Sequence, residues 1–337
     1  MKYLELAGLS EDMLQVEENL REFLDTGERS HALAEIIREQ LEIRGKRLRP
    51  LLVLLSGRLG DPDSRTRSRL CKTAALIEMV HMASLIHDDI VDDSPLRRGR
   101  PSVQAKYGKD MAVYAGDFFL SRILQILMRE NLTETGMLFG RTVESMCWGE
   151  IGQLAGYFDT SMTADRYLEN IYGKTVAVCE LACVSGGREG GCSDETVGQL
   201  LQLGNSFGFL FQIRDDLLDF LSEEQAEGKP VHTDLREGIL TLPVLCALEC
   251  EESREQITGL IERFHRGEGT DTEMQRLDAL IRQSGGMEQA VRIMENYGAA
   301  AERSIRQLPA CDAREALAAV IQMLRLPDSI HKQGSVA

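Results

Sequence analysis

The sequence has little of what builds sheets, disulfide scaffolds or aromatic-rich surfaces. Only 5% of its 337 residues are aromatic, one is tryptophan and eight are proline. Alternation of apolar and polar residues between turn signals, which is typical of strands, is essentially absent. Eight cysteines occur, but none forms a C-x-x-C pair and no nearby histidine completes a zinc set. We therefore expect reduced, buried thiols and a reducing compartment.

Signals for export and for nucleic-acid binding are also lacking. The first residues, MKYLELAGLSED, do not have the basic-then-apolar build of a signal peptide. No apolar run approaches the roughly 18 residues of a membrane span. Basic residues number 38 against 54 acidic ones, for a formal net charge of −16, whereas nucleic-acid binding proteins usually carry a basic footprint. We expect a cytoplasmic protein with no nucleic-acid partner and at most a peripheral membrane contact.

What the chain does have is a succession of long segments with helical periodicity. Apolar residues recur every three or four positions from Leu70 to Ile86, which places them along one side of a helix. Similar runs cover about 111–129, 136–156, 164–187, 194–221 and 240–264, and two more helices are expected after about residue 286. These runs predict an all-α protein with one domain over residues 1–330 and a flexible tail at 331–337.

Four aspartates crowd the expected end of one of these helices. The segment HDDIVDD (87–93) comes just before Pro95, which should end the helix. Asp88 and Asp92 share one side and repel each other, and the helix dipole disfavours negative charge at this end. The segment should therefore bind cations, and oxygen ligands suit a hard ion such as Mg²⁺. For one such cluster alone, a solvated acidic cap is an equally good interpretation.

A second aspartate cluster favours cation binding over a solvated acidic cap. FQIRDDLLD (211–219) repeats the D-D-x-x-D pattern 127 residues after the first and follows the apolar run Leu200–Phe211. Two identical motifs on two apolar helices predict helices that face each other across a pocket. Mg²⁺ shares its coordination shell readily with substrate phosphates. We therefore predict that both motifs belong to one domain and bridge several ions to a diphosphate.

Basic residues gather in or near the breaks between helical runs. They occur in GKRLRP (45–50), at Arg97-Arg98, at Lys174 and in GKP (228–230). Each of them alone could be a solvated surface residue. In a strongly acidic chain, however, cations close to acidic clusters indicate anionic ligands.

These motifs, in this order, resemble those of the trans-isoprenyl diphosphate synthases, the polyprenyl synthetase family. The resemblance runs from about residue 40 to 245 and is carried by GKRLRP (45–50), HMASLIHDDIVDDSPLRRGRPS (81–102), AGDFFL (115–120), GEIGQL (149–154), KT (174–175), FQIRDDLLD (211–219), GKP (228–230) and DLREGILTLP (234–243). It implies a single-domain antiparallel helix bundle around a deep central cavity, usually in a homodimer. Ile239 stands where many short-chain members carry a lysine.

The resemblance also implies roles for individual residues. Those implied to hold three Mg²⁺ on an allylic diphosphate are Asp88, Asp89, Asp92, Asp215, Asp216 and Asp219, with Asp88, Asp92, Asp215 and Asp219 as the metal ligands. Those implied to contact the same diphosphate are Arg97, Lys174, Thr175, Gln212 and Lys229, and Lys174 is also implied in catalysis. Those implied to bind isopentenyl diphosphate are Lys46, Arg49, His81 and Arg98.

The implied activity is a Mg²⁺-dependent head-to-tail (1′-4) condensation of isopentenyl diphosphate onto an allylic diphosphate. Farnesyl or geranylgeranyl diphosphate would be the primer, and the product a long-chain all-trans polyprenyl diphosphate. A geranylgeranyl or farnesyl diphosphate synthase, or the catalytic subunit of an enzyme with a small partner subunit, are alternatives. A class I terpene cyclase is disfavoured because its N-D-x-x-S-x-x-x-E motif is absent.

The helix that leads into Asp88 also predicts the product length. Ser84 and Ala83 lie about one turn before Asp88 and Val80 about two turns, and no aromatic residue occurs from 71 to 87. One isoprene unit is about as long as one helical turn, roughly 5.4 Å. An open channel of several turns predicts a hexaprenyl to octaprenyl product, with a floor formed by a phenylalanine in AGDFFL, Phe118 or Phe119.

A large side chain introduced at the mouth of this channel should shorten the product. Ser84→Phe or Ala83→Tyr should stop elongation at farnesyl or geranylgeranyl diphosphate, and Val80→Phe should stop it about one unit later because it lies one turn deeper. Condensation should survive in all three variants because the aspartates are untouched. The chain-length distribution of each variant, resolved by chromatography, tests this. If Ser84→Phe and Val80→Phe both leave the longest product unchanged, this helix does not line the channel.

Overall fold

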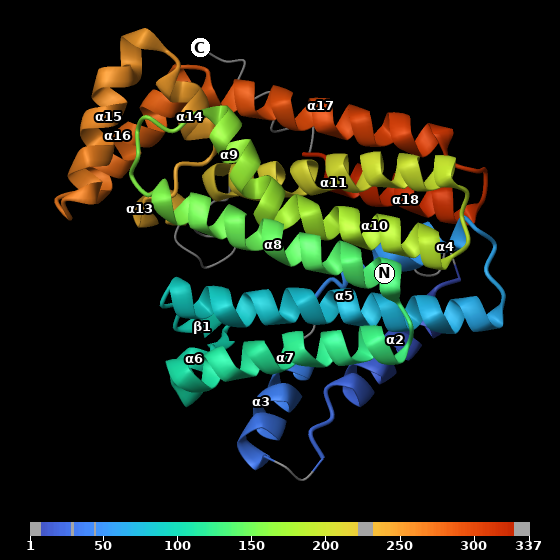
Figure 1. Cartoon of the computed structure of the whole chain (residues 1–337). Helices are drawn as coiled ribbons and strands as arrows, with labels where there is room; N and C mark the ends of the chain where they lie inside the picture. The colour runs from blue at the N-terminus through green and yellow to red at the C-terminus, as the bar shows by residue number, and fades with distance from the viewer. Residues whose placement is uncertain (1–7, 28–29, 44, 222–231, 327–337) are drawn as a thin grey trace. The chain divides into compact units, whose positions relative to one another are not determined.

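The computed structural model describes residues 8–27, 30–43, 45–221 and 232–326 (Figure 1). Its elements in chain order are α2 (Ser10–Phe23), α3 (His31–Glu42), α4 (Leu48–Arg58), α5 (Ser64–Val91), β1 (Leu96–Arg97), β2 (Arg100–Pro101), α6 (Val103–Tyr107), α7 (Lys109–Arg129), α8 (Thr133–Ala155), α9 (Ala164–Ile171), η1 (Tyr172–Val176), α10 (Ala177–Glu189), α11 (Asp194–Leu221), α13 (Thr233–Glu237), α14 (Leu242–Leu248), α15 (Glu251–His265), α16 (Asp271–Gln283), α17 (Gly286–Gln307) and α18 (Asp312–Leu324). The prediction of an all-α protein is confirmed. The predicted tail at 331–337 lies outside the described residues.

Contacts between residues divide the chain into two compact units. Unit 1 consists of Met1–Arg141, Leu181–Leu201 and Gln307–Leu317, and unit 2 of Thr142–Glu180, Gln202–Arg306 and Ala318–Ala337. The chain therefore enters each unit more than once, and α8, α10, α11, α17 and α18 contribute residues to both. One domain over residues 1–330 stays a prediction.

Unit 1 is built around α5, the helix that ends in the first aspartate motif. Figure 1 shows α7 alongside α5, and α2 and α4 also pack against it. The start of α5 is capped by Asp63, whose carboxylate accepts a hydrogen bond from the backbone N–H of Thr66 at 2.8 Å. Leu51, Ala74 and Phe119 are each no more than 1% exposed and belong to the core of this unit.

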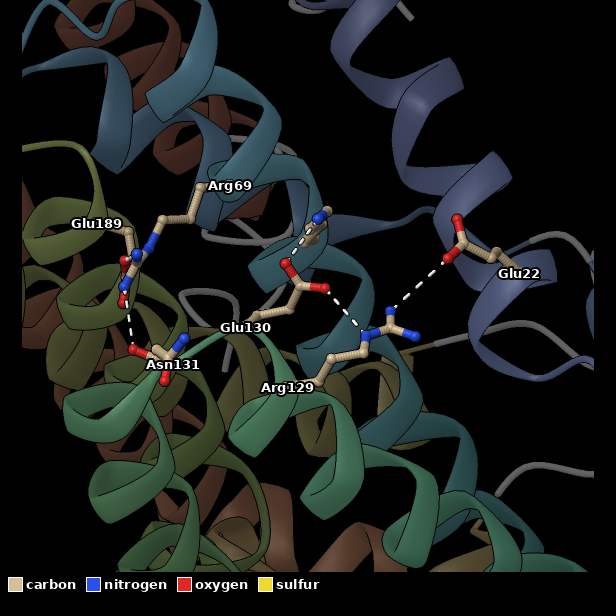
Figure 2. A network of polar contacts seen from close by, with 7 residues as sticks. Glu22, Arg69, Arg129, Glu130, Asn131 and Glu189 are labelled. Atoms are coloured by element: carbon tan, nitrogen blue, oxygen red, sulfur yellow. Dashed lines mark hydrogen bonds and ion pairs between the residues drawn. The ribbon is translucent and has the colours of Figure 1, made fainter.

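A polar network surrounds the start of α5 and the end of α7, at residues whose roles are structural. Figure 2 labels six of its members, which are Glu22, Arg69, Arg129, Glu130, Asn131 and Glu189. The Arg129 guanidinium lies 3.6 Å from the Glu22 carboxylate (Nη2 to Oε1) and 3.1 Å from the Glu130 carboxylate (Nε to Oε1). Arg69 lies 2.5 Å from Glu189 and donates to the Asn131 carbonyl at 3.4 Å. Because most of these side chains are partly exposed, the network orients α2, α5, α7 and α10 more than it stabilises them.

Unit 2 contains the second aspartate motif and a cluster formed by α14, α15 and α16. The periodicity over about 240–264 predicted one helix there, and this is wrong. The helical conformation is interrupted at Glu249 and Cys250, between α14 and α15. Arg254 donates from Nε to the Leu248 carbonyl at 2.6 Å and from Nη2 to the Glu249 carbonyl at 3.3 Å. These bonds satisfy carbonyls that a continuous helix would have paired within itself.

By length and composition, α7 is long and apolar enough to cross a membrane, with a mean hydropathy of 1.3 over its most apolar window. The expectation that no segment comes close to this composition is therefore wrong for α7. One such helix is weak evidence for a membrane span, because core helices of soluble proteins pass the same test. In unit 1, α7 packs along α5 and contributes Ala115, Phe119 and Ile123 to the core.

Within unit 1, α4 and α10 touch backbone to backbone at glycines, so an added methyl group there should destabilise the fold. A Cβ at Gly186 would lie 2.3 Å from the Val53 carbonyl oxygen, and backbone cannot yield as a side chain can. Gly186→Ala should lower the free energy of unfolding by about 2 kcal/mol. Gly198→Ala, on an exposed part of α11 with open space around it, should instead raise it by up to about 1 kcal/mol. Urea denaturation of both variants measures the difference, and equal effects would contradict the close contact.

Candidate functional site

The first aspartate motif closes α5 as the sequence predicted. The helix ends at Val91 and Asp92 is its C-cap residue. Asp89 is only 3% exposed, and burial raises its pKa, whereas its pair with Arg97 lowers it. The Arg97 Nε donates to Asp89 at 2.8 Å. Asp88 is half-buried and Asp92 is exposed, so the first and last aspartates of the motif lie nearer the surface than the middle one.

Arg97 ends the first strand of a tight hairpin, and Arg98 is the first residue of its turn. Strands β1 and β2 pair Arg97 with Arg100, and the two residues between them have positive φ, 52° at Arg98 and 75° at Gly99. This is the backbone of a type I′ turn, for which glycine is favoured. As a result, Arg97 reaches Asp89, whereas the Arg98 guanidinium lies against Gly45, where a Cβ would be 2.7 Å from Nη1.

Unit 1 therefore brings together three of the four residues predicted to bind isopentenyl diphosphate. Burial, and after it the nearby charges of Arg49 and Arg98, lower the pKa of His81 well below its usual 6.5. The Arg49 Nε is buried and has no hydrogen-bond partner within the described residues. The fourth residue, Lys46, is exposed and directly follows Gly45. The arrangement is a cationic cluster beside a neutral imidazole.

Arg47 lies between Lys46 and Arg49 in the sequence, but its side chain forms ion pairs within the fold. It is 8% exposed and has φ 51°, a left-handed backbone. Its guanidinium donates to Glu78 of α5 at 2.5 Å and to Glu17 of α2 at 2.8 Å. These ion pairs attach the segment that carries Lys46 and Arg49 to two helices of unit 1. Of the three cations in GKRLRP, Arg47 is therefore the one engaged in ion pairs within the described part of the fold.

The second aspartate motif in unit 2 repeats the pattern of the first. Asp215 is exposed, Asp219 is half-buried and Asp216 is only 5% exposed. Tyr167 donates to one oxygen of Asp216 at 2.5 Å, and Gln212 donates to the other at 2.8 Å. Burial raises the pKa of Asp216 to about 7, although both hydrogen bonds lower it. Gln212 in turn accepts a hydrogen bond from Thr175 at 2.7 Å.

Asp234 belongs with this motif, and the sequence analysis missed it as a functional residue. Burial and the charges of Asp216 and Asp219 raise the pKa of Asp234 to about 8. The backbone N–H groups of His232 and Thr233 bond Asp219, at its carbonyl (3.2 Å) and at Oδ1 (3.2 Å), and so place Asp234 nearby. The only signal was its position in DLREGILTLP, because neither periodicity nor a repeated motif marks it.

In the described part of unit 2, Oδ2 of Asp219 is the carboxylate oxygen most available to a cation. Oδ2 is buried and has no hydrogen-bond partner within the described residues. In the described ranges, no three His, Cys, Asp or Glu side chains converge closely enough to hold a metal ion alone. The donor set, oxygen only and crowded with negative charge, fits a hard divalent cation. Lys229, predicted to contact the diphosphate, lies outside the described residues.

Lys174 and Thr175 occupy one turn of π-helix, η1, between α9 and α10. Such turns occur often at functional sites because they displace side chains from the regular helical face. Gly173 and Gly149 allow η1 to approach α8, since a Cβ on Gly173 would lie 2.2 Å from the Ser145 carbonyl oxygen. Lys174 Nζ lies 3.2 Å from Glu150 of α8. Unit 2 thus places Lys174, Thr175 and Gln212 around the same buried network.

The residues predicted to set chain length lie on different sides of α5. Ser84 is half-buried, like His81 and Asp88 on the same side of the helix, and its hydroxyl donates to the His81 carbonyl at 3.0 Å. Ala83 and Val80 are each 1% exposed. Phe119 is fully buried and Phe118 half-buried. Their roles in product length stay predictions.

A cavity of about 1090 Å³ opens in unit 1 and is lined by parts of α2, α3 and the segment Gly45–Arg47. Among the predicted site residues, only Lys46 lines it. It is therefore a different cavity from the central one that the sequence predicts.

Comparison with known proteins agrees with these motifs. The chain matches the polyprenyl synthetase family over residues 30–280. It is 34% identical to heptaprenyl diphosphate synthase component 2 of Bacillus subtilis, over 84% of this chain and 79% of that protein. The decaprenyl diphosphate synthase structure from Rhodobacter capsulatus superposes with a TM-score of 0.88 at 29% identity, covering 96% of this chain and 97% of that one.

A third similar protein is known with ligands bound. The polyprenyl synthase of Caulobacter crescentus, in complex with calcium and isoprenyl diphosphate, superposes with a TM-score of 0.84 at 29% identity. The alignment covers 96% of this chain and 96% of that one.

The buried Asp234 should make the metal-free protein less stable as the pH rises. Its folded-state pKa of about 8 exceeds the usual 3.8, so the folded state loses stability as pH increases from about 4 through 8. Asp234→Asn should therefore raise the melting temperature more at pH 8 than at pH 5 in the presence of EDTA. Thermal unfolding at both pH values measures this, with Glu255→Gln on the exposed side of α15 as the control. A gain that is independent of pH would contradict a buried, ionising Asp234.

Proposed function

The chain belongs to the polyprenyl synthetase family of prenyltransferases, and on this premise we propose that it condenses isopentenyl diphosphate with an allylic diphosphate. The product would be a long-chain all-trans polyprenyl diphosphate, formed with Mg²⁺ on a farnesyl or geranylgeranyl primer. The observation that carries the proposal is the repeated D-D-x-x-D motif, accompanied by cations in both units. In each motif the first and last aspartates lie nearer the surface than the buried middle one.

The residues present fit a divalent cation. Asp88 and Asp92 of α5, and Asp215 and Asp219 of α11, supply hard oxygen ligands, which Mg²⁺ combines with water and phosphate oxygens. Oδ2 of Asp219, which has no hydrogen-bond partner in the part of the chain that the structure describes, supports this assignment. The Caulobacter crescentus relative is itself complexed with calcium and isoprenyl diphosphate. When bound, such ions would stabilise the negative charge that develops on a departing diphosphate.

The cationic cluster of unit 1 suits the second substrate. Lys46, Arg49 and Arg98 would bind the diphosphate of isopentenyl diphosphate, because guanidinium groups match phosphate oxygens in pairs. His81 would be a neutral hydrogen-bonding group there, since its pKa is well below 6.5. In unit 2, Lys174, Thr175 and Gln212 would contact the allylic diphosphate, and the resemblance implies the same role for Arg97 and Lys229.

These roles account for the chemistry of the condensation. The allylic C–O bond breaks and the electron pair leaves with the diphosphate, whose charge the surrounding cations stabilise. The isopentenyl double bond then attacks the allylic cation and forms the new C–C bond. Loss of a proton restores an alkene, and the released diphosphate would accept this proton, since the described residues offer no evident His or Glu base. An apolar cavity around the reacting carbon would prevent water from trapping the cation.

The assembly and location of the enzyme are part of the same proposal. We propose a cytoplasmic homodimer that contacts the membrane only at its periphery, for release of the product. The similarity to a heptaprenyl synthase named component 2 favours a second candidate, a catalytic subunit that acts with a small partner. A geranylgeranyl or farnesyl product remains the alternative for chain length.

One experiment tests these points together. The purified chain, with Mg²⁺, labelled isopentenyl diphosphate and geranyl, farnesyl or geranylgeranyl diphosphate, should form a ladder of polyprenyl products. Asp88→Asn should lower kcat by more than about a hundredfold, because it removes a metal ligand. Asp110→Asn, at an exposed aspartate of α7, should change kcat by less than about twofold.

The outcomes separate the alternatives. Elongation by the chain alone supports a self-sufficient enzyme, whereas elongation only in the presence of an added second subunit supports the heteromer. A ladder that ends at twenty carbons or fewer contradicts the long-chain product. No condensation with any allylic primer, or a normal rate in Asp88→Asn, contradicts the proposed activity.

A further inference from the structure

The middle aspartate of the second motif is held differently from its neighbours. Both carboxylate oxygens of Asp216 accept hydrogen bonds from side chains, Oδ2 from Tyr167 and Oδ1 from Gln212. Tyr167 is 4% exposed and Asp216 5% exposed, so the bond between them is shielded from water, whereas Gln212 is half-buried. Asp215 is exposed, and one oxygen of Asp219 has no hydrogen-bond partner among the described residues. A metal ion at Asp216 would therefore have to compete with two donors, of which Tyr167 is buried.

The same hydrogen bonds determine the orientation of the Gln212 amide and of the Thr175 hydroxyl. The amide nitrogen of Gln212 faces Asp216 and donates to its Oδ1 at 2.8 Å. The amide oxygen of Gln212 then faces Thr175, whose hydroxyl donates to it at 2.7 Å. The direction of every bond in the series from Tyr167 to Thr175 thus follows from the carboxylate. Burial also raises the pKa of the Tyr167 hydroxyl well above 10, so it remains a donor.

We propose that Tyr167 is a positioning residue of the condensation reaction, which acts through Asp216 to hold Gln212 and Thr175 in place for the allylic diphosphate. Asp216 is then the acceptor at the centre of this network and not a direct metal ligand. The inference rests on the proposed function, because Gln212 and Thr175 matter only if an allylic diphosphate binds there. Tyr167 lies on α9, outside every motif that the sequence analysis used.

The decisive variant is Tyr167→Phe, because it removes one hydroxyl and keeps the packed ring. It leaves one oxygen of a buried carboxylate without a partner, so Asp216 should turn toward another donor and release Gln212. We expect kcat/KM for the allylic diphosphate to fall about tenfold or more. KM for isopentenyl diphosphate should change by less than about twofold, since its predicted ligands lie in other elements.

Tyr172→Phe is the matched control in the same unit. It also removes a hydroxyl that bonds a carboxylate, Glu180 at 3.0 Å, but that pair is exposed. Its kinetic constants should stay within about twofold of the parent enzyme. A merely structural role of Tyr167 would lower the melting temperature and the active fraction, and so affect both substrates equally. That result, or equal constants in the two variants, overturns the inference.

Asp216→Asn gives a second, independent test that does not depend on the fold of Tyr167→Phe. The amide still accepts from Tyr167, and its NH₂ can donate to Gln212 once the Gln212 amide turns over. Activity should therefore stay within about tenfold of the parent, with the same Mg²⁺ concentration for half-maximal rate. Asp215→Asn should lose more than about a hundredfold and require more Mg²⁺.

Two further results delimit the inference. If Asp216→Asn shifts the Mg²⁺ requirement as Asp215→Asn does, Asp216 is a metal ligand and the inference is wrong. In the Asp216→Asn background, Tyr167→Phe should cost less than in the parent, and strictly additive effects would also overturn it. If the parent enzyme itself fails to condense these substrates, the proposed function fails instead, so the two failures are distinguishable.

Discussion

A carboxylate that is withdrawn from water must be paired, and this requirement organises both aspartate motifs. Within D-D-x-x-D, the first and last residues share one side of the helix, and the middle one lies about 100° away. Asp89 and Asp216 therefore turn into their units, where Arg97 pairs with one and Tyr167 and Gln212 bond the other. Because burial alone would leave these groups unstable as anions, the partners are as necessary as the aspartates themselves.

The same ion pairing gives neighbouring basic residues different roles. One of each pair of neighbours stabilises the fold, and the other is left to bind a ligand. Arg47 turns inward to Glu17 and Glu78, whereas Lys46 on one side of it is exposed. Arg97 pairs with Asp89, whereas Arg98, the first residue of the two-residue turn, lies beside Gly45. In each case a residue with positive φ changes the chain direction within one step. A run of basic residues thus supplies both an anchor and a binding group.

Close backbone contacts at glycine complete the arrangement in each unit. Gly149 and Gly173 let η1 approach α8 in unit 2, which brings Lys174 within 3.2 Å of Glu150. In unit 1, Gly45 leaves room for the guanidinium of Arg98. A methyl group at any of these positions would separate elements that carry the charged side chains. Because glycine has no side chain, the elements that carry the charged side chains can lie close together at these positions.

The sequence by itself determined whatever depends on neighbours along the chain. Helical periodicity placed the run 194–221 at the bounds of α11, and Pro95 marked the end of α5, because these signals are local. The spacing of the aspartates identified both motifs for the same reason. Periodicity failed at α14 and α15, where the break depends on Arg254 bonding the last carbonyls and not on any proline or glycine.

Only the tertiary structure decided which members of a motif turn inward and which residues far along the chain support them. Tyr167 lies 49 positions from Asp216, and Arg47 lies 31 from Glu78, so no local pattern connects either pair. Asp234 gains its raised pKa from burial and from charges on α11, neither of which is encoded in its own segment. Burial and charge proximity are properties of packing, and packing exists only once distant parts of the chain have come together.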